Sequence, residues 1–71
     1  MIAAATVLFH LFVTDPSPRD PHLHGAHTHA LDSFSTMAEC VEKGRQEVKA
    51  MNNMKGFKKD AKYECRIELT P

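Results

Sequence analysis

The first thirteen residues are the most apolar run of the chain, and this run constrains the fold more than any other feature. From Thr6 to Val13 most side chains are bulky or β-branched, which favours a strand. Alternate residues of a strand share a face, so one face would carry Val7, Phe9, Leu11 and Val13 and the other Leu8, His10 and Phe12. Because both faces are apolar, we expect this strand at the centre of a small sheet.

The same run does not have the features of a targeting segment. It is too short to cross a membrane as a helix. A secretory leader needs a basic start and a small-residue cleavage site, but no basic residue precedes Arg19, and the run ends in Thr14, Asp15 and Pro16. We therefore expect a structural strand and no membrane partner, and the missing leader favours a cytoplasmic location.

Three prolines interrupt the chain after this strand. Pro16, Pro18 and Pro21 remove three backbone donors and restrict three φ angles within six residues. The first strand should therefore end near Thr14, and residues 14–28 should form a loop of extended character. Residues 28–34 alternate weakly and are predicted to return as a second strand.

A helix is predicted after this second strand. Thr36, followed three residues later by Glu39, forms a capping-box pattern, in which each side chain would bond to the other residue's backbone N–H. Asn52, Asn53 and Gly56 mark the end of the helix. One face should be buried, because apolar and small residues recur with helical spacing at Met37, Cys40, Val41, Gly44, Val48 and Met51.

The end of the chain shows the clearest strand alternation. Tyr63, Cys65, Ile67 and Leu69 would form a core face, and Glu64, Arg66, Glu68 and Thr70 a solvated face. The order of elements predicts an α+β fold, a small ββαβ domain over residues 1–71 with a three-stranded antiparallel sheet. The first strand would lie in the middle, and a right-handed crossover through the helix would make the outer strands parallel.

One helix can cover only one face of such a sheet. The other face would expose Leu8 and Phe12, with His10 between them, beside the charged row of the last strand. Contiguous apolar side chains left open on a sheet usually mark an interface. We therefore predict that Leu8, His10 and Phe12 form a homodimer contact or dock a protein partner.

The two cysteines are expected to face the same core. Cys40 lies on the apolar stripe of the helix and Cys65 on the core face of the last strand, so their Cα atoms should approach within about 7 Å. A disulfide is expected in an oxidising compartment and two buried thiols in a reducing one. A chain of 71 residues benefits from such a link, because its own core is small.

The proline-bounded loop contains an unusual histidine pattern. His22, His24, His27 and His29 follow the spacing H-x-H-x-x-H-x-H, in which neighbouring pairs could each offer two imidazoles to zinc or another transition metal. Structural zinc sites usually combine cysteine with histidine at fixed spacings. We therefore expect a solvated loop with weak metal affinity and no dedicated cofactor, and we keep a metal-binding function as the alternative.

The positive charge is concentrated in one region although the whole chain is neutral. Residues 43–62 carry a net charge of plus five. Within this region Lys55, Lys58, Lys59 and Lys62 surround Phe57 and could attract a nucleic acid or another anionic polymer. The neutral total argues against a dedicated nucleic-acid binder, so an ordinary solvated loop with Phe57 folded into the core is the simpler expectation.

These observations favour a non-enzymatic interaction protein. There is no close CxxC pair and no pattern that indicates an activated nucleophile, so we expect no catalytic site. The arrangement of Phe34, Thr36, Met37 and Cys40 with Tyr63 and Cys65 is similar to many small single-domain proteins of bacteria and their phages. We expect a protein that occupies a surface of a host protein complex, as small phage inhibitors do.

Overall fold

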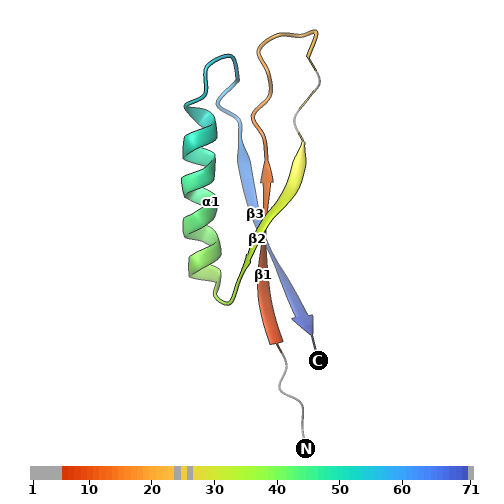
Figure 1. The fold of residues 1–71 in the computed structure, drawn as a ribbon, viewed down its shortest axis with the longest axis vertical. Helices are drawn as coiled ribbons and strands as arrows, with labels where there is room; N and C mark the ends of the chain where they lie inside the picture. Colours follow the sequence, from red (N-terminus) through yellow and green to blue (C-terminus); the bar gives the residue numbers. More distant parts are fainter. Residues whose placement is uncertain (1–5, 24, 26, 71) are drawn as a thin grey trace, which may run out of the picture.

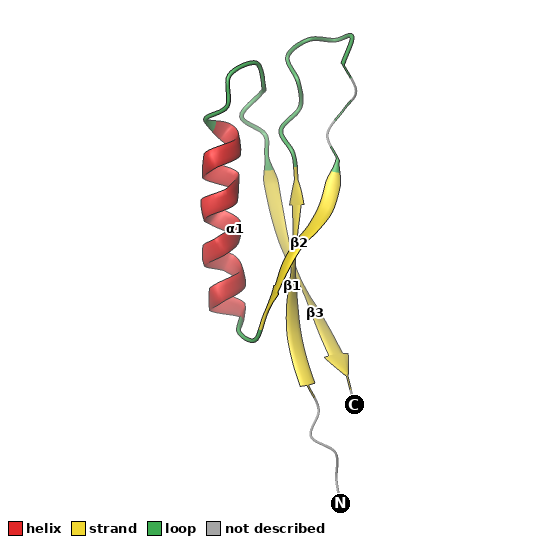
Figure 2. Ribbon diagram, viewed as in Figure 1, coloured by secondary structure: helices red, strands yellow, loops and turns green. Residues whose placement is uncertain are grey.

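The fold is a three-stranded sheet with one helix on one face. The computed structural model describes residues 6–23, 25 and 27–70. It contains strand β1 (Thr6–Thr14), strand β2 (Thr28–Phe34), helix α1 (Met37–Asn52) and strand β3 (Lys62–Thr70) (Figures 1 and 2). The strands lie in the order β2-β1-β3, and β1 is antiparallel to both neighbours. The predicted α+β class and ββαβ order are confirmed.

The central strand ends where the prolines begin. Thr14 is the last residue of β1, and Pro16 is buried beside it. One further β-type hydrogen bond follows the strand, from the N–H of Asp15 to the carbonyl of His27. The pairing of β1 with β2 shifts by one residue between Leu11 and Phe12, whereas its pairing with β3 is continuous from Thr6 to Thr14.

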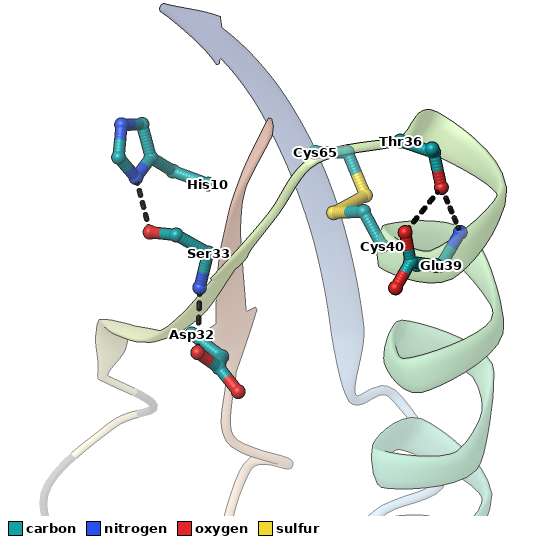
Figure 3. Close-up of a disulfide and its surroundings, with 7 residues drawn as sticks. All are labelled: His10, Asp32, Ser33, Thr36, Glu39, Cys40 and Cys65. Carbon is teal, nitrogen blue, oxygen red and sulfur yellow. Dashed lines mark hydrogen bonds between the residues drawn. A yellow bond between two sulfur atoms is a disulfide. The ribbon is translucent and has the colours of Figure 1, made fainter. Parts of the chain in front are cut away.

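The helix begins at the predicted cap. Thr36 has extended backbone angles, and its hydroxyl accepts the N–H of Glu39 at 3.2 Å (Figure 3). The reciprocal bond differs from the prediction, because Oε1 of Glu39 accepts the hydroxyl of Thr36 at 2.8 Å instead of its backbone N–H. The hydroxyl therefore serves as donor and acceptor at once.

In the part of the chain that the structure describes, no helix is long and apolar enough to cross a membrane.

The core lies between α1 and the middle of the sheet. Leu11, Val13 and Cys40 are fully buried, and the disulfide between Cys40 and Cys65 runs through this region (Figure 3). The two Cα atoms are 6.2 Å apart, so the predicted approach of the cysteines is confirmed. The residues packed around this centre are only partly buried: Phe9, Phe34, Met51, Tyr63 and Cys65.

Close contact between α1 and β3 depends on Gly44. A Cβ atom at this position would lie 2.6 Å from Cγ of Tyr63, closer than real Cβ contacts allow. The aromatic ring therefore packs directly on the helix backbone. Glycine is unfavourable inside a helix by about 1 kcal/mol relative to alanine, and the contact with Tyr63 explains its presence here.

The helix covers less of the sheet than its pattern suggested. Ile67 and Leu69 share the face of Cys65, as predicted, but 60% and 66% of their surfaces are exposed, so their assignment to the core was wrong. The reason is geometric. Phe34, the last residue of β2, pairs with Phe9, and α1 starts just after it and runs back along the sheet. The lower ends of β1 and β3 consequently project past the helix as a two-stranded ribbon (Figure 1).

Candidate binding face

The open face of the sheet is the surface that α1 leaves uncovered. The side chains of β1 on this face are the predicted ones, Leu8, His10 and Phe12, because Leu11 and Val13 point into the core under the helix. The register places Leu8 opposite Glu68, His10 opposite Arg66 and Phe12 opposite Glu64 of β3. An apolar and aromatic centre therefore has a charged row along one side.

The open face is less exposed than predicted. Leu8, His10 and Phe12 are half-buried, because side chains of the neighbouring strands flank the central strand on this face. The guanidinium of Arg66 lies 4.2 Å from the centre of the Phe12 ring, a cation–π contact that shields part of it. Nε of Arg66 also donates to Glu64 at 3.1 Å. The prediction that Leu8 and Phe12 are the large apolar side chains left in water was therefore wrong in degree.

His10 is the centre of a hydrogen-bonded row across all three strands. Its Nδ1 lies 2.6 Å from Oγ of Ser33 in β2, and its Nε2 lies 2.6 Å from Oε2 of Glu68 in β3 (Figure 3 shows the bond to Ser33). A neutral ring protonated on Nε2 satisfies both bonds, with the serine hydroxyl donating to Nδ1. The row fixes the imidazole orientation and links both outer strands to β1.

The row contains a hydroxyl, an imidazole and a carboxylate, but its surroundings do not resemble a catalytic site. Acyl transfer needs N–H donors aimed at the oxygen that becomes charged. The N–H of Ser33 is already bonded to Oδ1 of Asp32 at 2.8 Å. The row also lies on an exposed sheet face, with half of the Glu68 side chain in solvent. The geometry supports a cross-strand link better than a nucleophile with its base.

The sequence did not reveal Ser33 and Glu68 as partners of His10. They lie 23 and 58 residues away along the chain, and only the register of the sheet brings them together. The alternation of β3 placed Glu68 on the correct face, which was the only available signal. Ser33 could not be aligned with His10 without knowledge of the irregular pairing between β1 and β2.

The histidines of the loop do not form a metal site in the part of the chain that the structure describes. His22, His27 and His29 are exposed, and His24 lies outside the described residues. His29 belongs to β2, where its Nδ1 lies 3.8 Å from Oδ1 of Asp15. Among the described residues, no three metal-ligating side chains come together in a way that could hold an ion.

We expect zinc to stabilise this protein only slightly. Imidazoles on a loop are not preorganised, so binding must also order them, and we expect micromolar affinity at best. At zinc ten times above its dissociation constant, the gain would be about 1.4 kcal/mol. Thermal melting with and without zinc measures this, with magnesium as the control cation. A stabilisation of several kcal/mol would show instead that metal is part of the fold.

The predicted basic segment is part of a structured pair of loops. The proline loop and the connection from α1 to β3 bind each other: Lys58 N–H donates to the Ser17 carbonyl at 2.7 Å, and Arg19 N–H to the Gly56 carbonyl at 3.0 Å. Both carboxylate oxygens of Asp60 accept bonds from Ser17. The hydroxyl and backbone N–H of Ser17 hold the pKa of Asp60 below its usual value.

The lysines of this segment remain exposed. Phe57 is half-buried, but it is not among the side chains packed against the core, so the expectation that it folds into the core was wrong. Lys55 and Lys59 line a shallow hollow next to the end of α1, and Arg19 of the proline loop joins them there. The sequence did not indicate that Arg19 lies near the basic segment, because the two are far apart along the chain. Lys58 and Lys62 do not line this hollow.

Comparisons with known proteins add no relative. The chain matches no protein-family model, no curated protein and no solved structure. The geometry of the chain itself is therefore the basis for the functional argument.

Proposed function

We propose that this protein is a non-enzymatic binding module that docks a protein partner on the open face of its sheet. The observation that supports this is the arrangement of Phe12, Arg66 and His10 on a face that α1 does not cover. The protein would act by occupying the surface of a host protein complex, in the manner of small phage inhibitors.

The composition of the face fits a binding surface. Aromatic residues and arginine are enriched at protein interfaces and among the residues that contribute most binding energy. Here an arginine already lies on an aromatic ring, so the pair would be buried as one unit. The charged row of Glu64, Arg66 and Glu68 would then form a polar rim and favour a partner with complementary charge.

The face is also preorganised. It is built on three paired strands, and His10 is held by hydrogen bonds on both sides. Side chains that are fixed before binding lose less conformational entropy when a partner docks. A rigid face therefore compensates for a modest apolar area.

The substitution Phe12→Asp is expected to abolish partner binding while leaving the fold intact. It removes the ring under Arg66 and places a carboxylate in the centre of the face, which should weaken a central contact by at least about 30-fold. Affinity capture from host lysate with quantitative mass spectrometry would identify the partner, and titration with the purified partner would give the change in affinity. Circular dichroism serves as the folding control.

A matched variant distinguishes this face from the rest of the surface. Met54→Asp introduces the same charge at an exposed apolar residue of the loop after α1 and should leave partner binding unchanged. Leu8→Asp provides a second change on the open face if Phe12→Asp does not fold. Unchanged partner binding by a folded Phe12→Asp variant would contradict the proposal and make the basic loop region the next candidate.

A further inference from the structure

The outer edge of β3 is unpaired among the residues that the structure describes. β3 pairs with β1 on one side, and no described strand lies on its other side. Nine residues make it as long as β1, and it contains no proline. Long exposed edges offer a row of backbone donors and acceptors to another strand, and natural proteins usually shield them.

The register identifies the backbone groups on this edge. The Asp15 N–H bonds to the His27 carbonyl, so at Asp15, and two residues earlier at Val13, the backbone groups of β1 point toward β2. The even-numbered residues of β1 therefore bond to β3, and through the continuous register so do the even-numbered residues of β3. The backbone N–H and C=O groups that point outward belong to Tyr63, Cys65, Ile67 and Leu69.

An exposed apolar strip accompanies this edge. Ile67 and Leu69 are 60% and 66% exposed, and Val7 of β1, opposite Leu69, is 38% exposed. Val7 and Leu69 belong to the two-stranded ribbon of β1 and β3 that projects beyond the helix (Figure 2), and Ile67 lies where this ribbon begins, opposite Phe9. Burying a large apolar side chain contributes about 1.5 to 3 kcal/mol, so a strand that docks on this edge would gain from the strip as well as from the backbone bonds.

The charges of β3 favour a second copy of the same strand. In an antiparallel pairing centred on Cys65, Lys62 of each copy lies opposite Glu68 of the other, and Glu64 lies opposite Arg66. Opposite charges across such a pair are stabilising and like charges are destabilising. A pairing centred on Arg66 would instead place two arginines opposite each other and Glu64 opposite Glu68.

A third register, centred on Ile67, is less complementary. It pairs Arg66 with Glu68 but places Glu64 opposite Thr70 and leaves Lys62 without an acidic partner, so it has half as many opposite-charge pairs. The register centred on Cys65 also places Tyr63 of each copy beside Ile67 of the other on the face of the helix. That contact covers one of the exposed side chains of the strip.

We propose that this protein forms a homodimer with twofold symmetry by antiparallel pairing of the two β3 edges, centred on Cys65. The product is a six-stranded sheet. Strands paired in this way keep equivalent side chains on the same face, so the two open faces become one continuous surface. The dimer does not depend on the proposed partner binding, because β3 pairs through its edge and the open face stays free.

The substitution Ile67→Pro tests whether the dimer forms through the outer edge of β3. The N–H of this residue points outward, so Ile67→Pro removes a donor from the dimer contact while the bonds of Arg66 and Glu68 to β1 remain. Sedimentation equilibrium should give twice the 8.0 kDa chain mass for the wild type and the single-chain mass for Ile67→Pro. Ile67→Val retains the donor and should stay dimeric. A wild type that is monomeric at roughly 1 mM chain would overturn the proposal.

Charge exchange tests the register and does not depend on the proline variant. Glu64→Arg or Arg66→Glu alone creates two like-charge pairs across the twofold axis and should weaken dimerisation roughly 10-fold. Glu64→Arg with Arg66→Glu restores opposite charges in the register centred on Cys65, so dimerisation should recover. In the register centred on Ile67 the double variant would place glutamates opposite each other. Failure to recover in a folded double variant would overturn the proposed register.

These measurements use only the purified protein. A wild type that is monomeric but captures its partner through the open face would contradict this inference and leave the proposed function standing. A dimer that captures no partner through the open face would contradict the proposed function alone.

Discussion

Reduction of the disulfide between Cys40 and Cys65 is expected to lower the free energy of unfolding by roughly 3.5 kcal/mol. The two residues are 25 positions apart, and the chain-entropy estimate for a loop of this length gives that value. For a domain of this size, the loss corresponds to a fall in melting temperature of about 20 °C. Calorimetry of the oxidised and the reduced wild type measures it directly.

A variant separates the covalent bond from the packing of the sulfur atoms. Cys40→Ala with Cys65→Ala removes the bond and also leaves a small void, because Cys40 is fully buried. It should therefore melt slightly below the reduced wild type and should not respond to reductant. Coincident melts of the oxidised and reduced wild type would show that the bond contributes nothing to stability.

The expected size of this effect reflects how little core the fold provides. Within the described chain, the buried hydrophobic core consists of Leu11, Val13, Cys40 and Ala61. The disulfide joins the first turns of α1 to the middle of β3, and Leu11 lies opposite Cys65 in the sheet. A covalent link through the centre of a small core compensates for the apolar surface that a chain of this length cannot bury.

Much of the local structure could be predicted from the sequence because it depends on local chemistry. The prolines after Thr14 end β1, Thr36 caps α1, and the alternation from Tyr63 to Leu69 identifies the faces of β3. The order of strands followed from one long-range argument, that a strand apolar on both faces belongs in the centre. The contact of the two cysteines could then be predicted, because Cys40 lies on the buried face of α1 and Cys65 on the core face of β3.

The extent of burial could not be predicted in the same way. Periodicity shows which side chains share a face, but the position of α1 along the sheet decides which of them are covered. Because β2 is short and ends at Phe34, opposite Phe9, α1 begins near this point of the sheet. The helix therefore does not cover Ile67 and Leu69. The open face is less exposed than predicted for a related reason. Arg66 covers the Phe12 ring, and this contact depends on the register between β1 and β3.

The hydrogen-bonded row through His10 shows a similar limit. A sequence identifies residues that can donate and accept, but Ser33 and Glu68 reach His10 from different strands. The contact of Ser17 with Asp60 also joins two loops that are distant in sequence. Such contacts require the register and the loop paths, which the residue pattern does not contain.

The substitution Leu11→Ala is expected to lower the free energy of unfolding by about 2 to 5 kcal/mol. Leu11 is fully buried under α1, and removing a large side chain there loses its transfer free energy and leaves a cavity that the backbone cannot close. Leu8→Ala is the matched control, because it makes the same change in the same strand but on the open face, where Leu8 is half-buried. Leu8→Ala should lower the free energy of unfolding by only about 1 kcal/mol, because Leu8 buries less apolar surface than Leu11. Chemical denaturation of the two oxidised variants measures both values, and equal losses would show that the open face is buried as deeply as the core beneath the helix.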